Sequence, residues 1–136
     1  MKTTLVGVIE KASDGGYGIY ALKDEVPVTG YGLTEEEAKK DFEIQVKEQA
    51  DYYRDKKGVY PKWYQNAMKI EYRYDMSAFF QSFSFINASE LAKSLGINPS
   101  LMRKYKNGLA KASDKQKDLI QKKFDGIVQR LELVKF

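Results

Sequence analysis

Hydrophobic and polar positions along the first part of the chain follow the pattern that β-strands require. Residues 3–11 and 17–22 are apolar runs, and residues 13–16 (SDGG) between them have the composition of a tight hairpin turn. Residues 26–32 form a third candidate strand. Residues 68–75 alternate between apolar and charged side chains, which predicts a half-buried fourth strand.

Between the third and fourth candidate strands, apolar residues return near helical spacing. Thr34 and Glu37 have the spacing of a capping box. The apolar positions that follow are Ala38, Phe42, Val46, Ala50 and Tyr53. This pattern predicts an amphipathic helix that ends by Gly58 and packs on the sheet.

From Met76 onward, the pattern is entirely helical. Residues 77–83 can form a short helix, and Asn87 with Glu90 has the spacing of a second capping box. A last helix begins at Ser113. Its apolar side carries Ile120, Phe124, Ile127, Val128 and Leu131.

These elements predict a mixed α+β chain with two domains. A β-β-β-α-β domain occupies residues 1–75, and an all-α domain occupies residues 76–136. Charge follows a similar division, since residues 1–58 carry 9 Lys and Arg against 12 Asp and Glu, whereas residues 59–136 carry 14 against 7. The net charges of −3 and +7 suggest different partners for the two halves, and the positive half suits a polyanion or an acidic protein.

The composition excludes several kinds of site. The chain has no histidine and no cysteine, which excludes the common zinc sites, a Ser-His-Asp triad and a cysteine nucleophile. Its carboxylates lie in predicted turns and helix starts, so we expect no enzyme, no catalytic residue, no metal and no cofactor. No apolar run reaches the roughly 18 to 20 residues that span a bilayer, and nothing marks the chain for export, so we expect a cytoplasmic protein without membrane contact.

One basic stretch, residues 96–108 (GINPSLMRKYKNG), predicts a short helix with two different sides. Asn98 suits the N-cap, and Pro99 suits the first helical position. The side chains expected to face the core are Met102 and Tyr105, with either Leu101 or Leu109. Those left to solvent are Ser100, Arg103, Lys104 and Lys106. On this pattern alone, the stretch is either a core helix with a solvated face or a helix that enters a DNA groove.

Residues 91–108 (LAKSLGINPSLMRKYKNG) resemble the helix-turn-helix of phage-repressor and Xre-like regulators. The resemblance implies that the second helix lies in the major groove of double-stranded DNA. It carries over Asn98, Ser100 and Lys104 as base or near-base contacts, and Arg103, Lys106 and Lys111 as phosphate contacts. The alternatives are a helical bundle whose charges only solvate it, and a helix-turn-helix fold that binds a protein.

The first domain has a resemblance of its own. Two segments are similar to the HicB antitoxin family. One is residues 14–17 (DGGY) after the first strand, and the other is residues 32–34 (GLT), which lead to residues 37–38 (EA). This resemblance implies a degenerate RNase H-like domain that neutralises a small HicA-type ribonuclease toxin, while the DNA-binding domain represses the operon of both. It also implies a homo-oligomer, a dimer or larger.

Two other functions remain open. The chain could be a stand-alone transcriptional regulator without a toxin, its first domain serving oligomerisation or ligand sensing. An RNA-processing enzyme would need a carboxylate cluster, which the sequence does not offer. The hairpin glycines need no ligand either, because a tight turn accounts for them.

Overall fold

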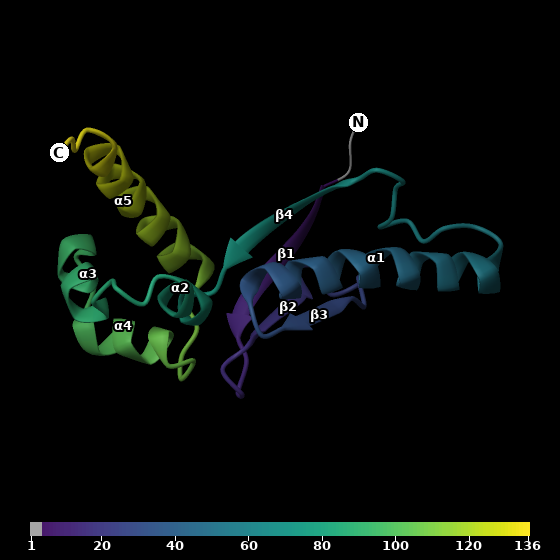
Figure 1. The fold of residues 1–136 in the computed structure, drawn as a ribbon, viewed down its shortest axis with the longest axis horizontal. Coiled ribbons are helices and arrows are strands. Elements are labelled where there is room, and N and C mark those ends of the chain that lie inside the picture. The colour runs from purple at the N-terminus through teal and green to yellow at the C-terminus, as the bar shows by residue number, and fades with distance from the viewer. Residues whose placement is uncertain (1–3) are drawn as a thin grey trace. The chain divides into compact units, whose positions relative to one another are not determined.

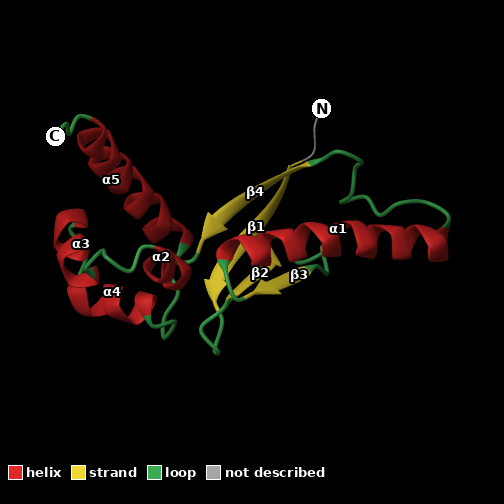
Figure 2. Cartoon of the chain, viewed as in Figure 1, coloured by secondary structure: helices red, strands yellow, loops and turns green. Residues whose placement is uncertain are grey.

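The computed structural model describes residues 4–136, which contain a four-stranded sheet and five helices (Figures 1 and 2). The mixed α+β class is therefore confirmed. The elements are β1 (Thr4–Lys11), β2 (Tyr17–Ala21), β3 (Thr29–Gly32), α1 (Glu35–Lys57), β4 (Lys69–Tyr74), α2 (Met76–Ser82), α3 (Ala88–Leu95), α4 (Pro99–Lys106) and α5 (Asp114–Glu132). The chain divides into two compact units, Met1–Ser82 and Phe83–Phe136. Within residues 4–136, no helix combines the length and the apolar character needed to cross a membrane.

The sheet has the strand order β3-β2-β1-β4. β2 is antiparallel to both of its neighbours, and β4 is parallel to β1 because α1 carries the chain across the sheet between β3 and β4. β3 begins at Thr29, later than the expected start at residue 26, since Pro27 has no N–H to donate to a ladder. Before it, the N–H of Ala21 still donates to the Val28 carbonyl at 3.3 Å.

α1 covers one face of the sheet (Figure 2). Thr34 caps it by accepting a hydrogen bond from the Glu37 N–H at 3.2 Å, and Gly58 ends it with a left-handed φ of 78°. Its buried residues are Ala38, Phe42, Val46 and Ala50. Against β3 the approach is very close, because a Cβ at Gly30 would lie 2.7 Å from the backbone of Phe42.

α2 belongs to the first unit. Ala78 and Phe80 are buried, and Ser77 Oγ accepts a hydrogen bond from the Lys11 N–H at 3.2 Å. The two units therefore divide after Ser82, and not at residue 75 where the strand pattern ends, because α2 contacts β1 and its Ala78 belongs to the core of the first unit.

The second unit contains α3, α4 and α5. Its buried apolar residues are Ala88, Ala92, Leu95, Ile97, Met102, Tyr105 and Ile120. Of the apolar row expected on α5, only Ile120 is buried; Phe124, Ile127 and Val128 are half-buried, and Leu131 is exposed. Most of this row is therefore incompletely buried in the single chain.

Candidate nucleic-acid interface

Two eight-residue helices and a sharp turn build the candidate interface. Asn87 caps α3 by accepting a hydrogen bond from the Glu90 N–H at 2.9 Å. α3 ends at Gly96, whose φ of 71° is left-handed, and the Ile97 N–H then donates to the Ala92 carbonyl at 2.8 Å. These bonds satisfy the end of α3 and redirect the chain at once into α4.

Asn98 starts α4. Its Oδ1 accepts hydrogen bonds from the N–H groups of Ser100 at 2.8 Å and Leu101 at 3.2 Å, and Pro99 occupies the first turn. The carbonyl oxygen of this side chain is therefore used inside the protein. Asn98 is expected to contact bases, and its amide NH₂ group is the part of the side chain that can still donate hydrogen bonds.

The inward side of α4 packs against α3. Met102 is fully buried and Tyr105 is nearly so, and Ala92 and Leu95 of α3 are buried as well. Between the two leucines that the pattern left open, Leu101 is half-buried, whereas Leu109 is 76% exposed. α4 is therefore fixed by its own apolar side, and its other side is presented to solvent.

The outward side of α4 carries positive charge. Lys104 and Lys106 are exposed on the helix, and Lys111 is exposed in the connection to α5. The unit as a whole, residues 83–136, has 11 Lys and Arg against 5 Asp and Glu, a net charge of +6. Such a surface attracts a polyanion.

Arg103 differs from these lysines because two side chains hold it. Its Nη1 donates to Ser89 Oγ of α3 at 2.8 Å, and its Nη2 donates to Ser100 Oγ at 3.0 Å. The guanidinium thus bridges the two helices at the surface while remaining exposed. It occupies Ser100 as an acceptor, and the hydroxyl of Ser100 keeps its own hydrogen to donate.

The structure adds two residues to those that the sequence indicated. Ser89 positions Arg103, and the Nζ of Lys123 in α5 would lie 2.8 Å from a Cβ added at Gly96, so this cation stands beside the turn between α3 and α4. Neither residue has a local signal in the sequence. Both reach the site only through the packing of separate helices.

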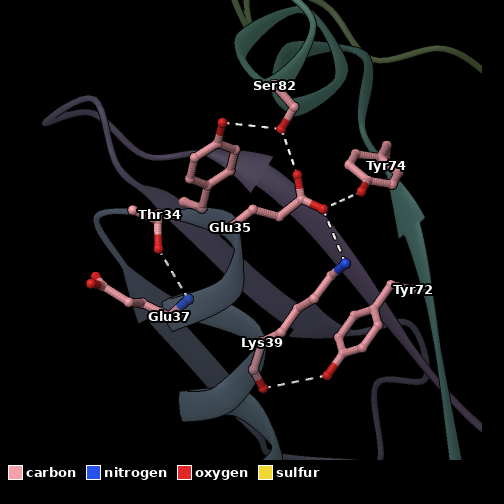
Figure 3. A network of polar contacts seen from close by, with 8 residues as sticks. Thr34, Glu35, Glu37, Lys39, Tyr72, Tyr74 and Ser82 are labelled. Atoms are coloured by element: carbon pink, nitrogen blue, oxygen red, sulfur yellow. Dashed lines mark hydrogen bonds and ion pairs between the residues drawn. The ribbon is translucent and has the colours of Figure 1, made fainter.

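The first unit contains a separate cluster of polar contacts around Glu35 (Figure 3). Its carboxylate accepts hydrogen bonds from Ser82 Oγ at 2.6 Å and from the Tyr74 hydroxyl, and it pairs with Lys39 Nζ at 3.0 Å. Burial alone would raise the pKa of Glu35, but the hydrogen bonds from Ser82, Tyr74 and Lys39 outweigh it and lower that pKa. The hydrogen bonds from Ser82 and Tyr74 join α1 to α2 and β4, whereas the pair with Lys39 lies within α1.

The second unit has exposed lysines, an arginine that two serines position, and a helix that packs through its apolar side. A surface that binds phosphates and base edges needs these features. Comparison with known proteins adds no identity to this geometry: no protein-family model, no curated protein and no solved structure matches this chain.

Proposed function

We propose that the second unit binds double-stranded DNA through the outward side of α4. The observation that carries the proposal is the division of this helix into two sides, with Met102 and Tyr105 buried and Lys104 and Lys106 exposed. A helix that enters the major groove must pack on its own domain through one side and must present polar and cationic side chains to DNA on the other. Asn98, Ser100 and Lys104 then serve as base or near-base contacts, and Arg103, Lys106 and Lys111 serve as phosphate contacts.

The turn between α3 and α4 supports a helix-turn-helix assignment. The apolar spacing of the resemblance is made by Leu91, Leu95, Ile97, Met102 and Tyr105. Leu91 is half-buried and the other four are buried. Because these residues would fix the crossing of the two helices, their burial is what the motif requires.

We further propose that the chain is a HicB-like antitoxin that represses its own operon in the cytoplasm. The first unit would neutralise a small HicA-type ribonuclease toxin, and the second would bind the operator. The resemblance in the hairpin and at the start of α1 supports this role, and so does the order of strands and helix. The proposed role is binding and not catalysis.

A homo-oligomer belongs to the same proposal, because paired operator half-sites call for two copies. The incompletely buried apolar row on α5 supports it: Leu131 is 63% exposed, and Leu133 just beyond the helix is 80% exposed. Sedimentation at micromolar concentration should show at least a dimer. A monomer at that concentration would remove this part of the proposal.

The second candidate is a stand-alone transcriptional regulator without a toxin. It shares the basic α4 and differs only in what the first unit does. Coexpression of the chain with the product of the adjacent open reading frame separates the two. Copurification with a small basic protein whose RNase activity the chain inhibits supports the antitoxin, and the absence of such a partner supports the regulator.

A salt titration tests DNA binding. The Lys104→Ala, Lys106→Ala double variant should bind the DNA upstream of its own gene more weakly. The slope of log affinity against log salt should fall by about 0.9 for each phosphate that the variant no longer neutralises. The matched control is Lys23→Ala, Lys62→Ala, which removes two exposed lysines from the first unit. Equal slopes for wild type and the α4 variant would show that α4 is only a solvated face.

A further inference from the structure

The sheet of the first unit has two edge strands, β3 and β4. Among the described residues 4–82, the contacts that block an edge lie at β3. β3 is four residues long, and it donates the outward Tyr31 N–H to Asp41 Oδ2 of α1 at 2.9 Å. α1 also lies directly over Gly30. A short edge strand whose outward N–H already donates to a side chain is poorly suited to pairing with another strand.

β4, at the opposite edge, is a regular strand. It is six residues long, contains neither proline nor glycine, and pairs with β1 on one side. The Asp75 N–H donates to the Ile9 carbonyl of β1 at 2.8 Å, which fixes the odd-numbered residues as those that bond to β1. The backbone groups of Ile70, Tyr72 and Tyr74 therefore point outward, away from the sheet.

The side chains of Ile70, Tyr72 and Tyr74 fix β4 against the rest of the first unit. Tyr72 donates its hydroxyl to the Lys39 carbonyl of α1 at 3.4 Å, and Tyr74 donates to Glu35 (Figure 3). Ile70 packs against the core of the first unit. The strand at this edge is thus anchored to α1.

The opposite face of β4 carries charges whose signs alternate. Lys69, Glu71 and Arg73 are exposed, and Asp75, half-buried just beyond the strand, accepts hydrogen bonds from Ser77. Two copies of β4 can pair antiparallel about a two-fold axis. An axis at Tyr72 places Glu71 of each copy opposite Arg73 of the other, which gives two such pairs. An axis at Glu71 would oppose Lys69 to Arg73, and an axis at Arg73 would oppose Glu71 to Asp75. Only the register centred on Tyr72 combines pairing along the full strand with opposite charges across it.

We propose that two copies of this chain associate through β4, antiparallel, with Tyr72 on the two-fold axis. The two sheets then form one continuous sheet of eight strands. Tyr72 exchanges backbone hydrogen bonds with its counterpart, and Ile70 does so with Tyr74 of the second copy. Glu71 and Arg73 stand at non-hydrogen-bonded positions, where side chains lie closest. This interface depends neither on DNA binding nor on a toxin.

Cross-linking tests the register directly, because the natural chain contains no cysteine. Full-length Glu71→Cys mixed with full-length Arg73→Cys should form a disulfide-linked dimer on mild oxidation, since non-hydrogen-bonded pairs have Cα atoms about 4.5 Å apart, within the range that disulfides accept. Either variant alone should give little dimer, because its two cysteines would be diagonal, about 7 to 8 Å apart. Thr29→Cys, exposed on β3, mixed with Arg73→Cys measures random cross-linking.

No dimer above the Thr29 control in the mixture would overturn the proposal. A dimer formed by Glu71→Cys alone would overturn the register by placing Glu71 on the axis. The readout is independent of α5 and of the basic face: Lys104→Ala, Lys106→Ala in the same background should leave the cross-link unchanged, so failure of DNA binding and failure of this interface are distinguishable.

Charge exchange provides a second test in the full chain. Glu71→Arg or Arg73→Glu alone sets like charges opposite each other and should weaken this association about tenfold in sedimentation. The Glu71→Arg, Arg73→Glu double variant restores the pairing, and a mixture of the two single variants should form a heterodimer. Both side chains are exposed, so the melting temperature should hardly change. Single variants that associate as well as wild type would contradict the proposed contact.

Discussion

Met102 and Leu109 show how strongly burial separates two apolar side chains near the same helix. Met102 is fully buried beneath α4, whereas Leu109 is 76% exposed just after it. We expect Met102→Ala to reduce the free energy of unfolding by about 2 to 5 kcal/mol, because it leaves a cavity between the helices. Leu109→Ala should change it by less than about 0.5 kcal/mol. Chemical denaturation of both variants gives the comparison, and equal losses would mean that α4 does not rest on Met102.

Glu35 should make the stability of the chain depend on pH. Its pKa is lowered from an ordinary value of 4.5 by the hydrogen bonds from Ser82, Tyr74 and Lys39, which outweigh its burial. A carboxyl with a lower pKa in the folded state stabilises the fold above the unfolded value, and this contribution is lost as the pH falls through the folded pKa. We expect Glu35→Gln to destabilise the chain by about 1 kcal/mol at pH 7.

The difference between wild type and Glu35→Gln should shrink as the pH falls below 4.5, because the wild type then loses the same charge by protonation. Denaturation curves at several pH values measure it. Glu36→Gln, at an exposed position next to it, is the control. A difference that is constant from pH 7 to pH 3 would contradict this account of Glu35.

The residues that the sequence could identify are those with local partners. Thr34, Asn87, Asn98 and Ser113 were predicted as helix starts, and each accepts a hydrogen bond from a backbone N–H two or three residues ahead. The bond from Arg103 to Ser89 spans 14 residues and depends on how α3 crosses α4. Sequence periodicity shows which side of a helix is apolar, but it does not show which polar side chains meet across two helices.

Asn98 is both the N-cap of α4 and a residue of the candidate interface, and one substitution can separate these two roles. Asn98→Asp should keep the cap, since aspartate accepts the same N–H bonds and suits the positive end of the helix. The free energy of unfolding should therefore stay within about 0.5 kcal/mol of wild type. DNA affinity should fall at least about tenfold, because the new carboxylate would face phosphates and acceptor atoms of the bases.

Ser113→Asp supplies the matched control, because Ser113 is the N-cap of α5 and receives the same change of charge. Asn98→Ala completes the set: it should lose about 1 kcal/mol with the cap. Melting curves and DNA affinities of the three variants are measured together. Full DNA affinity in a stable Asn98→Asp protein would exclude the start of α4 from the interface.

Strands and helices could be predicted well where periodicity was long, and less well where a short element completes a distant core. The alternation of β4 and the apolar spacing of α1 both appear as elements in the structure. α2 was expected in the second domain because its pattern is helical like everything after it. Its membership in the first unit follows from contacts with β1, which lies more than 60 residues earlier in the chain and which no local pattern can indicate.

The division of the chain after Ser82 can be tested with two fragments of the first unit. Residues 1–82 keep Ala78 and Phe80, which are buried, and keep the hydrogen bond from Ser82 to Glu35. Residues 1–75 lack all three, and Ala78 belongs to the core of the first unit. Burying one side chain of the size of phenylalanine is worth about 1.5 to 3 kcal/mol, so the loss is a large part of the stability of a small domain.

We therefore expect residues 1–82 to unfold in one cooperative transition, and residues 1–75 to melt at a much lower temperature or not cooperatively at all. The full-length Phe80→Ala variant is the control for the loss of one buried side chain of α2, and it should lose about 3 to 5 kcal/mol. Circular dichroism melting of each protein gives the comparison. If residues 1–75 were as stable as residues 1–82, α2 would be a connector that only rests on the sheet, and the two units would divide where β4 ends.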